Sequence, residues 1–160
     1  MNMHNTKNDL SQETREQMIG ILNARLADSL DLKSQAKQAH WNVKGMNFIA
    51  LHELFDDVAT EVEGYTDTIA ERVTILGGTA EGTVRVAAQK SSLSQYPLEI
   101  SDGRDHVDAL STALADFGKK VRGNIDEADD AGDVDTADLF TEVSRGIDKM
   151  LWFVEAHIQS

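Results

Sequence analysis

Five side chains of the kinds that bind metal ions lie between residues 40 and 71: His40, His52, Asp56, Asp67 and Glu71. An α-helix turns by about 100° per residue, so the last four share one face if residues 48–76 are helical. Measured from His52, Asp56 lies at about 40°, Asp67 at about 60° and Glu71 at about 100°. Imidazoles combined with carboxylates suit Fe(II) better than magnesium or calcium, and bridging carboxylates would allow one or two ions. The alternative is that histidine and aspartate four residues apart form only a surface pair.

These side chains are too far apart along one helix to share an ion. At about 1.5 Å per residue, Asp56 and Asp67 are separated by about 16 Å, and His52 and Glu71 by about 28 Å. Bonds from metal to ligand are only about 2 Å long. An antiparallel pairing with a second copy around a two-fold axis would solve this, and it would create two equivalent sites. The sequence therefore predicts a homo-oligomer, in which a histidine half-site (His40, His52 and Asp56) faces a carboxylate half-site (Asp67 and Glu71) of the partner.

Four long amphipathic segments could position these residues, because their apolar side chains recur every three or four positions. They cover residues 11–38, 48–76, 107–125 and 140–158. Ser11 is a candidate N-cap, the apolar face of the second segment runs from Phe48 to Leu76, and Gly77 and Gly78 end it. Short turns join the first segment to the second and the third to the fourth.

Between the second and third segments lies a connection of roughly 25 residues, longer than usual, in which residues 83–90 could form a short helix. Two helical hairpins joined by one long crossover predict an all-α, ferritin-like four-helix bundle with a short extra helix in the crossover. We expect a single domain over residues 11–160, preceded by a flexible N-terminal tail over residues 1–10.

Composition narrows the class of protein. The 160 residues carry a formal net charge of −13, which disfavours nonspecific binding to DNA or anionic membranes and favours attraction of cations. Without cysteine, any metal must be held by nitrogen and oxygen. No apolar run approaches the roughly 20 residues that span a bilayer, and the polar N-terminus lacks a signal-peptide core. We therefore expect a cytoplasmic protein with no membrane partner.

Three stretches resemble the Dps proteins, the ferritin-like DNA-protection proteins of starved bacteria. They are QAHWNVKGMNFIALHELFDDVATEVEGYTDTIAERVTILGG (residues 38–78), SQYPLEI (94–100) and SRGIDKMLWFVEAHI (144–158). The resemblance implies a hollow dodecamer in the bacterial cytoplasm, with two ferroxidase sites at each dimer interface. It places His40, His52 and Asp56 of one chain opposite Asp67 and Glu71 of its partner as iron ligands, and all five are present.

The resemblance also implies an activity. Members of this family are oxidoreductases that oxidise Fe(II), using hydrogen peroxide in preference to oxygen, and store Fe(III) as a mineral. The expected metal is therefore iron (Fe2+/Fe3+), with up to two ions per site, and the expected benefit is protection against oxidative damage. Trp41 would lie beside the iron site, where it either accepts stray oxidising equivalents or serves as a packing aromatic near an interface.

An acidic stretch follows the third segment: Asp126, Glu127, Asp129, Asp130, Asp133, Asp135 and Asp138. In similar proteins this region lines a three-fold pore through which iron enters, and Asp129, Asp133 and Asp138 match the pore positions best. Three copies of each aspartate around a narrow hole would attract cations strongly. The alternative is a solvated acidic loop in which Asp133 or Asp135 caps a helix.

The alternative function is binding and compaction of nucleoid DNA. Phosphate contacts need clustered lysine and arginine. The first 17 residues contain only Lys7 and Arg15, and the last six contain neither. We therefore expect DNA binding to be weak or absent.

His4, His106 and His157 have no partners in the pattern and are interpreted as surface or structural residues. Trp152 is expected in the core or at an interface.

Overall fold

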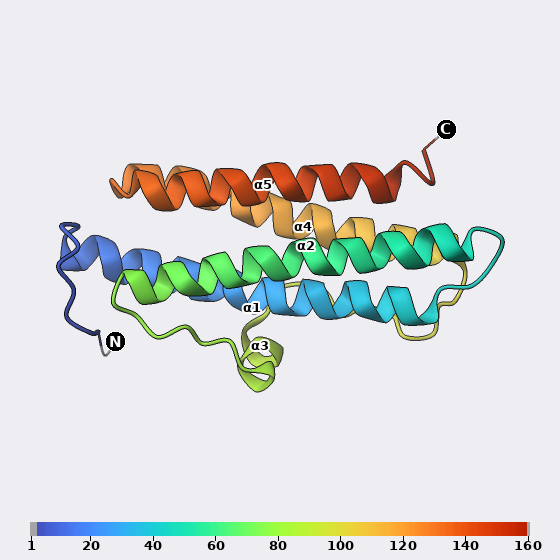
Figure 1. The fold of residues 1–160 in the computed structure, drawn as a ribbon, viewed down its shortest axis with the longest axis horizontal. Helices are drawn as coiled ribbons and strands as arrows, with labels where there is room; N and C mark the ends of the chain where they lie inside the picture. The colour runs from blue at the N-terminus through green and yellow to red at the C-terminus, as the bar shows by residue number, and fades with distance from the viewer. Residues whose placement is uncertain (1–2, 160) are drawn as a thin grey trace.

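The computed structural model describes residues 3–159, and helices account for most of them. The elements are α1 (Gln12–Asn42), α2 (Phe48–Ile75), α3 (Val84–Lys90), α4 (Gly103–Asp130) and α5 (Val134–Glu155). The pair α1 and α2 packs against the pair α4 and α5, and the short α3 lies outside the bundle beside α1 (Figure 1). The predicted all-α, ferritin-like bundle with an extra helix in the crossover is confirmed. None of the helices described is long and apolar enough to cross a membrane.

The helix ends follow local chemistry. Ser11 caps α1 as predicted, because its hydroxyl accepts a hydrogen bond from the backbone N–H of Thr14 at 3.0 Å. Thr83 caps α3 and Asp102 caps α4 in the same way. Gly45 has a φ of 113° in the turn between α1 and α2, a conformation that favours glycine. That turn is held to the segment before α4 by a hydrogen bond from Lys44 N–H to the Ser101 carbonyl, at 2.8 Å.

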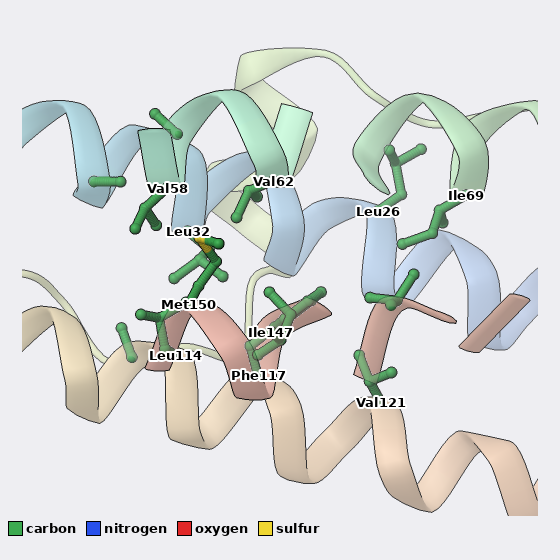
Figure 2. Packing of buried hydrophobic residues seen from close by; sticks show 14 of the residues in the cluster. Leu26, Leu32, Val58, Val62, Ile69, Leu114, Phe117, Val121, Ile147 and Met150 are labelled. Atoms are coloured by element: carbon green, nitrogen blue, oxygen red, sulfur yellow. The ribbon is translucent and has the colours of Figure 1, made fainter. Parts of the chain in front are cut away.

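The core runs along the bundle axis between the two pairs. Figure 2 shows its central layers, to which all four long helices contribute. They include Leu26 and Leu32 from α1, Val58, Val62 and Ile69 from α2, Leu114, Phe117 and Val121 from α4, and Ile147 and Met150 from α5. Replacing a large side chain here by alanine, for example Phe117, would lower the free energy of unfolding by about 3–5 kcal/mol, because apolar burial is lost and a cavity remains.

Two apolar side chains are more exposed than the sequence pattern predicts. Phe48 begins α2 beyond the end of the core and is 43% exposed, with its ring 5.1 Å from that of His52. Trp152 is 59% exposed, so its placement in the core of the chain is wrong, and an interface is the remaining interpretation.

The long crossover is fixed by buried polar groups of α1 as well as by apolar packing. Asp28 is completely buried and accepts hydrogen bonds from the backbone N–H and the hydroxyl of Ser92, and it pairs with Arg25. Gln35 donates to the Ser94 carbonyl at 3.0 Å. These buried polar residues explain why α1 is less clearly amphipathic than the other long helices.

Residues 3–10 lie against the end of α2, where the backbone N–H of His4 donates to the Gly77 carbonyl at 2.8 Å. The side chain of Arg15 joins the same region through the carbonyls of Leu10 and Leu76. The expected flexibility of residues 1–10 stays a prediction, and residues 1–2 lie outside the described residues.

Candidate metal centre

The histidine half-site lies where the end of α1 meets the beginning of α2. His40 occupies the last turn of α1 and His52 the second turn of α2, so the hairpin brings two residues 12 apart in sequence together. Their imidazole rings stack with centroids 3.8 Å apart and planes inclined by 20°. Each ring is hydrogen-bonded through Nδ1 to the other residue's backbone carbonyl, at 2.7 Å from His40 and 2.8 Å from His52.

This reciprocal arrangement selects one tautomer for both rings. A carbonyl oxygen can only accept, so the proton of each neutral ring must lie on Nδ1. The lone pair of each Nε2 is then free. Metal-binding histidines are oriented in this way, by donating their second ring N–H to a backbone carbonyl or a carboxylate. His40 and His52 therefore form a preorganised pair of nitrogen donors.

Asp56 lies one turn further along α2 and is half-exposed. Its Oδ1 accepts a hydrogen bond from Lys37 Nζ at 2.6 Å. This hydrogen bond lowers the pKa of the Asp56 carboxyl, and the positive charge of Lys37 lowers it further, against the raising effect of desolvation. The sequence interpretation missed Lys37. The only available signal was its position one turn before His40, on the face of α1 that turns toward α2.

The carboxylate half-site lies on the second half of α2. Asp67 and Glu71 are exposed and one turn apart. Arg72 anchors this end of the helix to the start of α5, donating from Nη2 to Asp133 at 2.7 Å and from Nε to Thr136 at 2.9 Å.

The chain does not bring the two half-sites together. Across residues 3–159, no group of three or more histidine, aspartate or glutamate side chains is placed so that it could hold a metal ion. Both half-sites lie on the same helix, and the rise of about 1.5 Å per residue keeps them apart.

Trp41 follows His40 directly and is 66% exposed. The ammonium group of Lys37 lies 5.7 Å from the centre of the Trp41 ring, so a single lysine contacts both Asp56 and this tryptophan. Oxidation of Trp41 or packing of its ring against a neighbouring molecule are both compatible with this exposure.

Comparison with known proteins gives a consistent result. The family model described as a ferritin-like domain matches residues 19–160. The DNA protection during starvation protein of Agrobacterium fabrum is 48% identical over 159 residues, which cover 99% of this chain and 98% of the relative. The chain belongs to the Dps family of ferritin-like proteins. Membership of this family supports iron storage and protection against oxidative damage in general terms.

Solved Dps structures share the whole fold. Dps of Mycobacterium smegmatis superposes with a TM-score of 0.93 at 30% identity, covering 98% of this chain and 96% of that one. Dps of Microbacterium arborescens, described as being in the high iron form, superposes with a TM-score of 0.87 at 32% identity, covering 97% and 99% of the two chains.

The acidic stretch of this Dps chain is mostly helical rather than a loop. Residues 126–130 form the last turns of α4, and only Ala131 and Gly132 separate them from Asp133, the N-cap of α5. Asp133 is 1% exposed, and its carboxylate accepts hydrogen bonds from Arg72 and from both the backbone N–H and the hydroxyl of Thr136. Asp133 therefore has the capping role that the sequence left open, and its carboxylate is not available to face a pore. Asp129 and Asp138 are exposed.

Proposed function

We propose that this Dps chain assembles into a dodecamer that oxidises Fe(II) with hydrogen peroxide and stores the Fe(III) inside. The observation that carries the proposal is the stacked pair His40 and His52, whose reciprocal hydrogen bonds leave both Nε2 atoms free. With Asp56, this pair supplies two nitrogen ligands and one oxygen ligand. Asp67 and Glu71 of a partner chain would supply the remaining oxygens, a donor set that suits Fe(II).

The proposed chemistry avoids free radicals because the electrons are taken in pairs. Two Fe(II) ions at one site each give one electron to a single hydrogen peroxide molecule. With two protons, the peroxide becomes two water molecules, and no hydroxyl radical is released. Oxygen is expected to be the less efficient oxidant. The carboxylates Asp56, Asp67 and Glu71 hold the ions and balance the additional positive charge of Fe(III).

The acidic end of α4 supports a route for cations. Asp129 and Asp130 lie in the last turn of α4, and no basic residue accompanies them there. Negative charge at the C-terminus of a helix is unfavourable because the helix dipole is negative at that end. We propose that Asp129 and Asp138, repeated around a three-fold axis, attract Fe(II) toward the interior. Asp133 takes no part in this route, because its carboxylate is buried and bonded to Arg72 and Thr136.

The decisive experiment follows Fe(II) oxidation after addition of peroxide by stopped-flow absorbance. Oxidation should be fast in the native protein and severely slowed in His52→Ala and in Asp67→Ala, with assembly checked by size-exclusion chromatography. Glu53→Ala is a matched control, because Glu53 is an exposed carboxylate next to His52 on α2 but outside both half-sites. Native rates in both ligand variants would overturn the assignment.

A further inference from the structure

The buried pair formed by Tyr96 and His106 has no part in the proposed iron site. Tyr96 belongs to the crossover before α4, and His106 lies in the first turn of α4. The two side chains are 7% and 1% exposed. The Tyr96 hydroxyl lies 2.7 Å from His106 Nδ1, and the two rings are stacked at 6.0 Å between centroids.

The surroundings fix the direction of this hydrogen bond. Burial raises the pKa of Tyr96, so the resting phenol keeps its proton. Burial also lowers the pKa of His106, against the raising effect of Asp105 and the backbone of Ile100 and Asn42, so the ring is neutral. A neutral ring has one N–H, and we assign Nδ1 as the acceptor because the Tyr96 hydroxyl has no other partner among the described residues to which it could donate. The ring proton therefore lies on Nε2, which has no hydrogen-bond partner of good geometry in the described structure.

A phenol that donates to a neutral imidazole in a buried site is suited to losing an electron and a proton together. One-electron oxidation makes a phenol strongly acidic, and a positive phenol radical would be unstable in an apolar site. His106 Nδ1, at 2.7 Å, can take the proton without any movement of the chain. The charge then resides on an imidazolium ring, which lies beside the backbone of Ile100 and Asn42.

We propose that Tyr96 and His106 form a proton-coupled trap for oxidising equivalents that escape the iron site. The external oxidant is a hydroxyl radical, formed when one Fe(II) rather than two reacts with hydrogen peroxide. The radical takes one electron from Trp41 and becomes hydroxide. Trp41 is restored by one electron from Tyr96, while the phenol proton moves to His106 Nδ1. The products are a neutral tyrosyl radical and an imidazolium ion, and no bond between heavy atoms is broken.

The fold supplies a connection between the two aromatic residues. Trp41 and Tyr96 line the same hollow of about 700 Å³, between the end of α1, α3 and the crossover. Asn42 directly follows Trp41, and its backbone lies close enough to His106 to raise the pKa of that ring. This inference rests on the proposed function, because the iron site is the source of the oxidant.

The chain provides its own control, since Tyr65 is the only other tyrosine. Tyr65 is half-buried on α2, and its hydroxyl donates to a Glu61 carboxylate oxygen at 2.6 Å. A carboxylate is ordinarily a weaker base than a neutral imidazole. Tyr65 is therefore the less suitable site for proton-coupled oxidation.

The test is electron paramagnetic resonance of the assembled protein, loaded with Fe(II) and frozen at intervals after peroxide is added. A tyrosyl radical should form in the native protein and in Tyr65→Phe, and it should be lost in Tyr96→Phe with Fe(II) oxidation unchanged. If Tyr96→Phe does not fold, the Tyr65→Phe variant is produced with ring-deuterated tyrosine and measured instead. Tyr96 is then the only tyrosine present, so a signal that narrows on deuteration must come from it.

A second arm needs no iron and oxidises the protein by a laser flash with a ruthenium complex and persulfate. The tyrosyl radical should again form, and its yield should fall in Trp41→Phe but not in Trp152→Phe. Fe(II) oxidation without any tyrosyl radical in either arm, or a radical lost only in Tyr65→Phe, would overturn the trap. Absence of Fe(II) oxidation together with a flash-induced Tyr96 radical would instead overturn the proposed iron chemistry and leave the trap intact.

Discussion

Two inactive variants of this protein should restore each other's activity when they assemble together. His52→Ala removes one ligand from the histidine half-site, and Asp67→Ala removes one from the carboxylate half-site. In an assembly of either variant alone, every site lacks a ligand. In a mixed dimer, one site lacks both ligands and the other is complete, because its histidine half comes from the Asp67→Ala chain and its carboxylate half from the His52→Ala chain.

The size of the recovery follows from this arrangement. If the two chains are produced in equal amounts and pair at random, half of the dimers are mixed, and each has one complete site out of two. About one quarter of all sites should therefore be intact. The assay is co-expression with two different affinity tags, purification through both, and stopped-flow measurement of Fe(II) oxidation by peroxide, with the rate expressed per chain. Selection through both tags enriches mixed assemblies, so one quarter applies to the unselected population.

The matched control combines His40→Ala with His52→Ala. Both changes lie in the histidine half-site, so every site of every mixed dimer still lacks one ligand. This mixture should stay as slow as either variant alone. Equal rates in the two mixtures, whether both recovered or both slow, would refute a site shared between two chains.

Three further measurements test other parts of the structure. Asp133→Ala leaves the buried guanidinium of Arg72 unpaired and removes the cap of α5, so the free energy of unfolding should fall by about 3–5 kcal/mol in urea denaturation. Asp135→Ala, two residues away and exposed, should change it by about 0.5 kcal/mol or less. Because burial lowers the pKa of His106, the unfolded state binds more protons in acid, and the unfolding temperature should fall as the pH drops below about 6.5. His106→Gln should flatten this dependence, and an unchanged slope would show that other groups cause it. Twelve chains at −13 each would carry −156, so mobility-shift assays at physiological salt and neutral pH should show little binding to DNA, whereas a tight complex would contradict the role given to charge.

The fold could be predicted from the sequence because its signals are local. Apolar periodicity, Ser11 as N-cap and the glycines after α2 each act within a few residues, and the structure confirms the helices that they predict. The predicted helix ends were less accurate where polar residues continue a helix. Residues 126–130 were expected in a loop but extend α4, although their carboxylates are unfavourable at its C-terminus.

The candidate site could be predicted only in part. Helical periodicity is sufficient to place His52 and Asp56 on one face of α2. The stacking of His40 on His52 depends on the exact turn between α1 and α2, and the pairing of Lys37 with Asp56 joins residues 19 apart on two helices. The buried pair of Tyr96 and His106 likewise arises where the crossover meets α4, and periodicity contains no information about it.

The ion pair between Lys37 and Asp56 bears on how the iron site fills. In the isolated chain the lysine ammonium lies 2.6 Å from one of the two carboxylate oxygens of Asp56 and competes there with an Fe(II) ion. The pair is substantially exposed, so it is worth little in free energy, and a divalent ion held by two imidazoles can displace it. Once displaced, the Lys37 ammonium still has the face of Trp41 within reach. In the structure the ammonium already contacts both Asp56 and the Trp41 ring. Filling of the iron site and the charge beside Trp41 are therefore coupled through one lysine, because an ion that displaces Lys37 from Asp56 leaves the ammonium free to stay beside this ring.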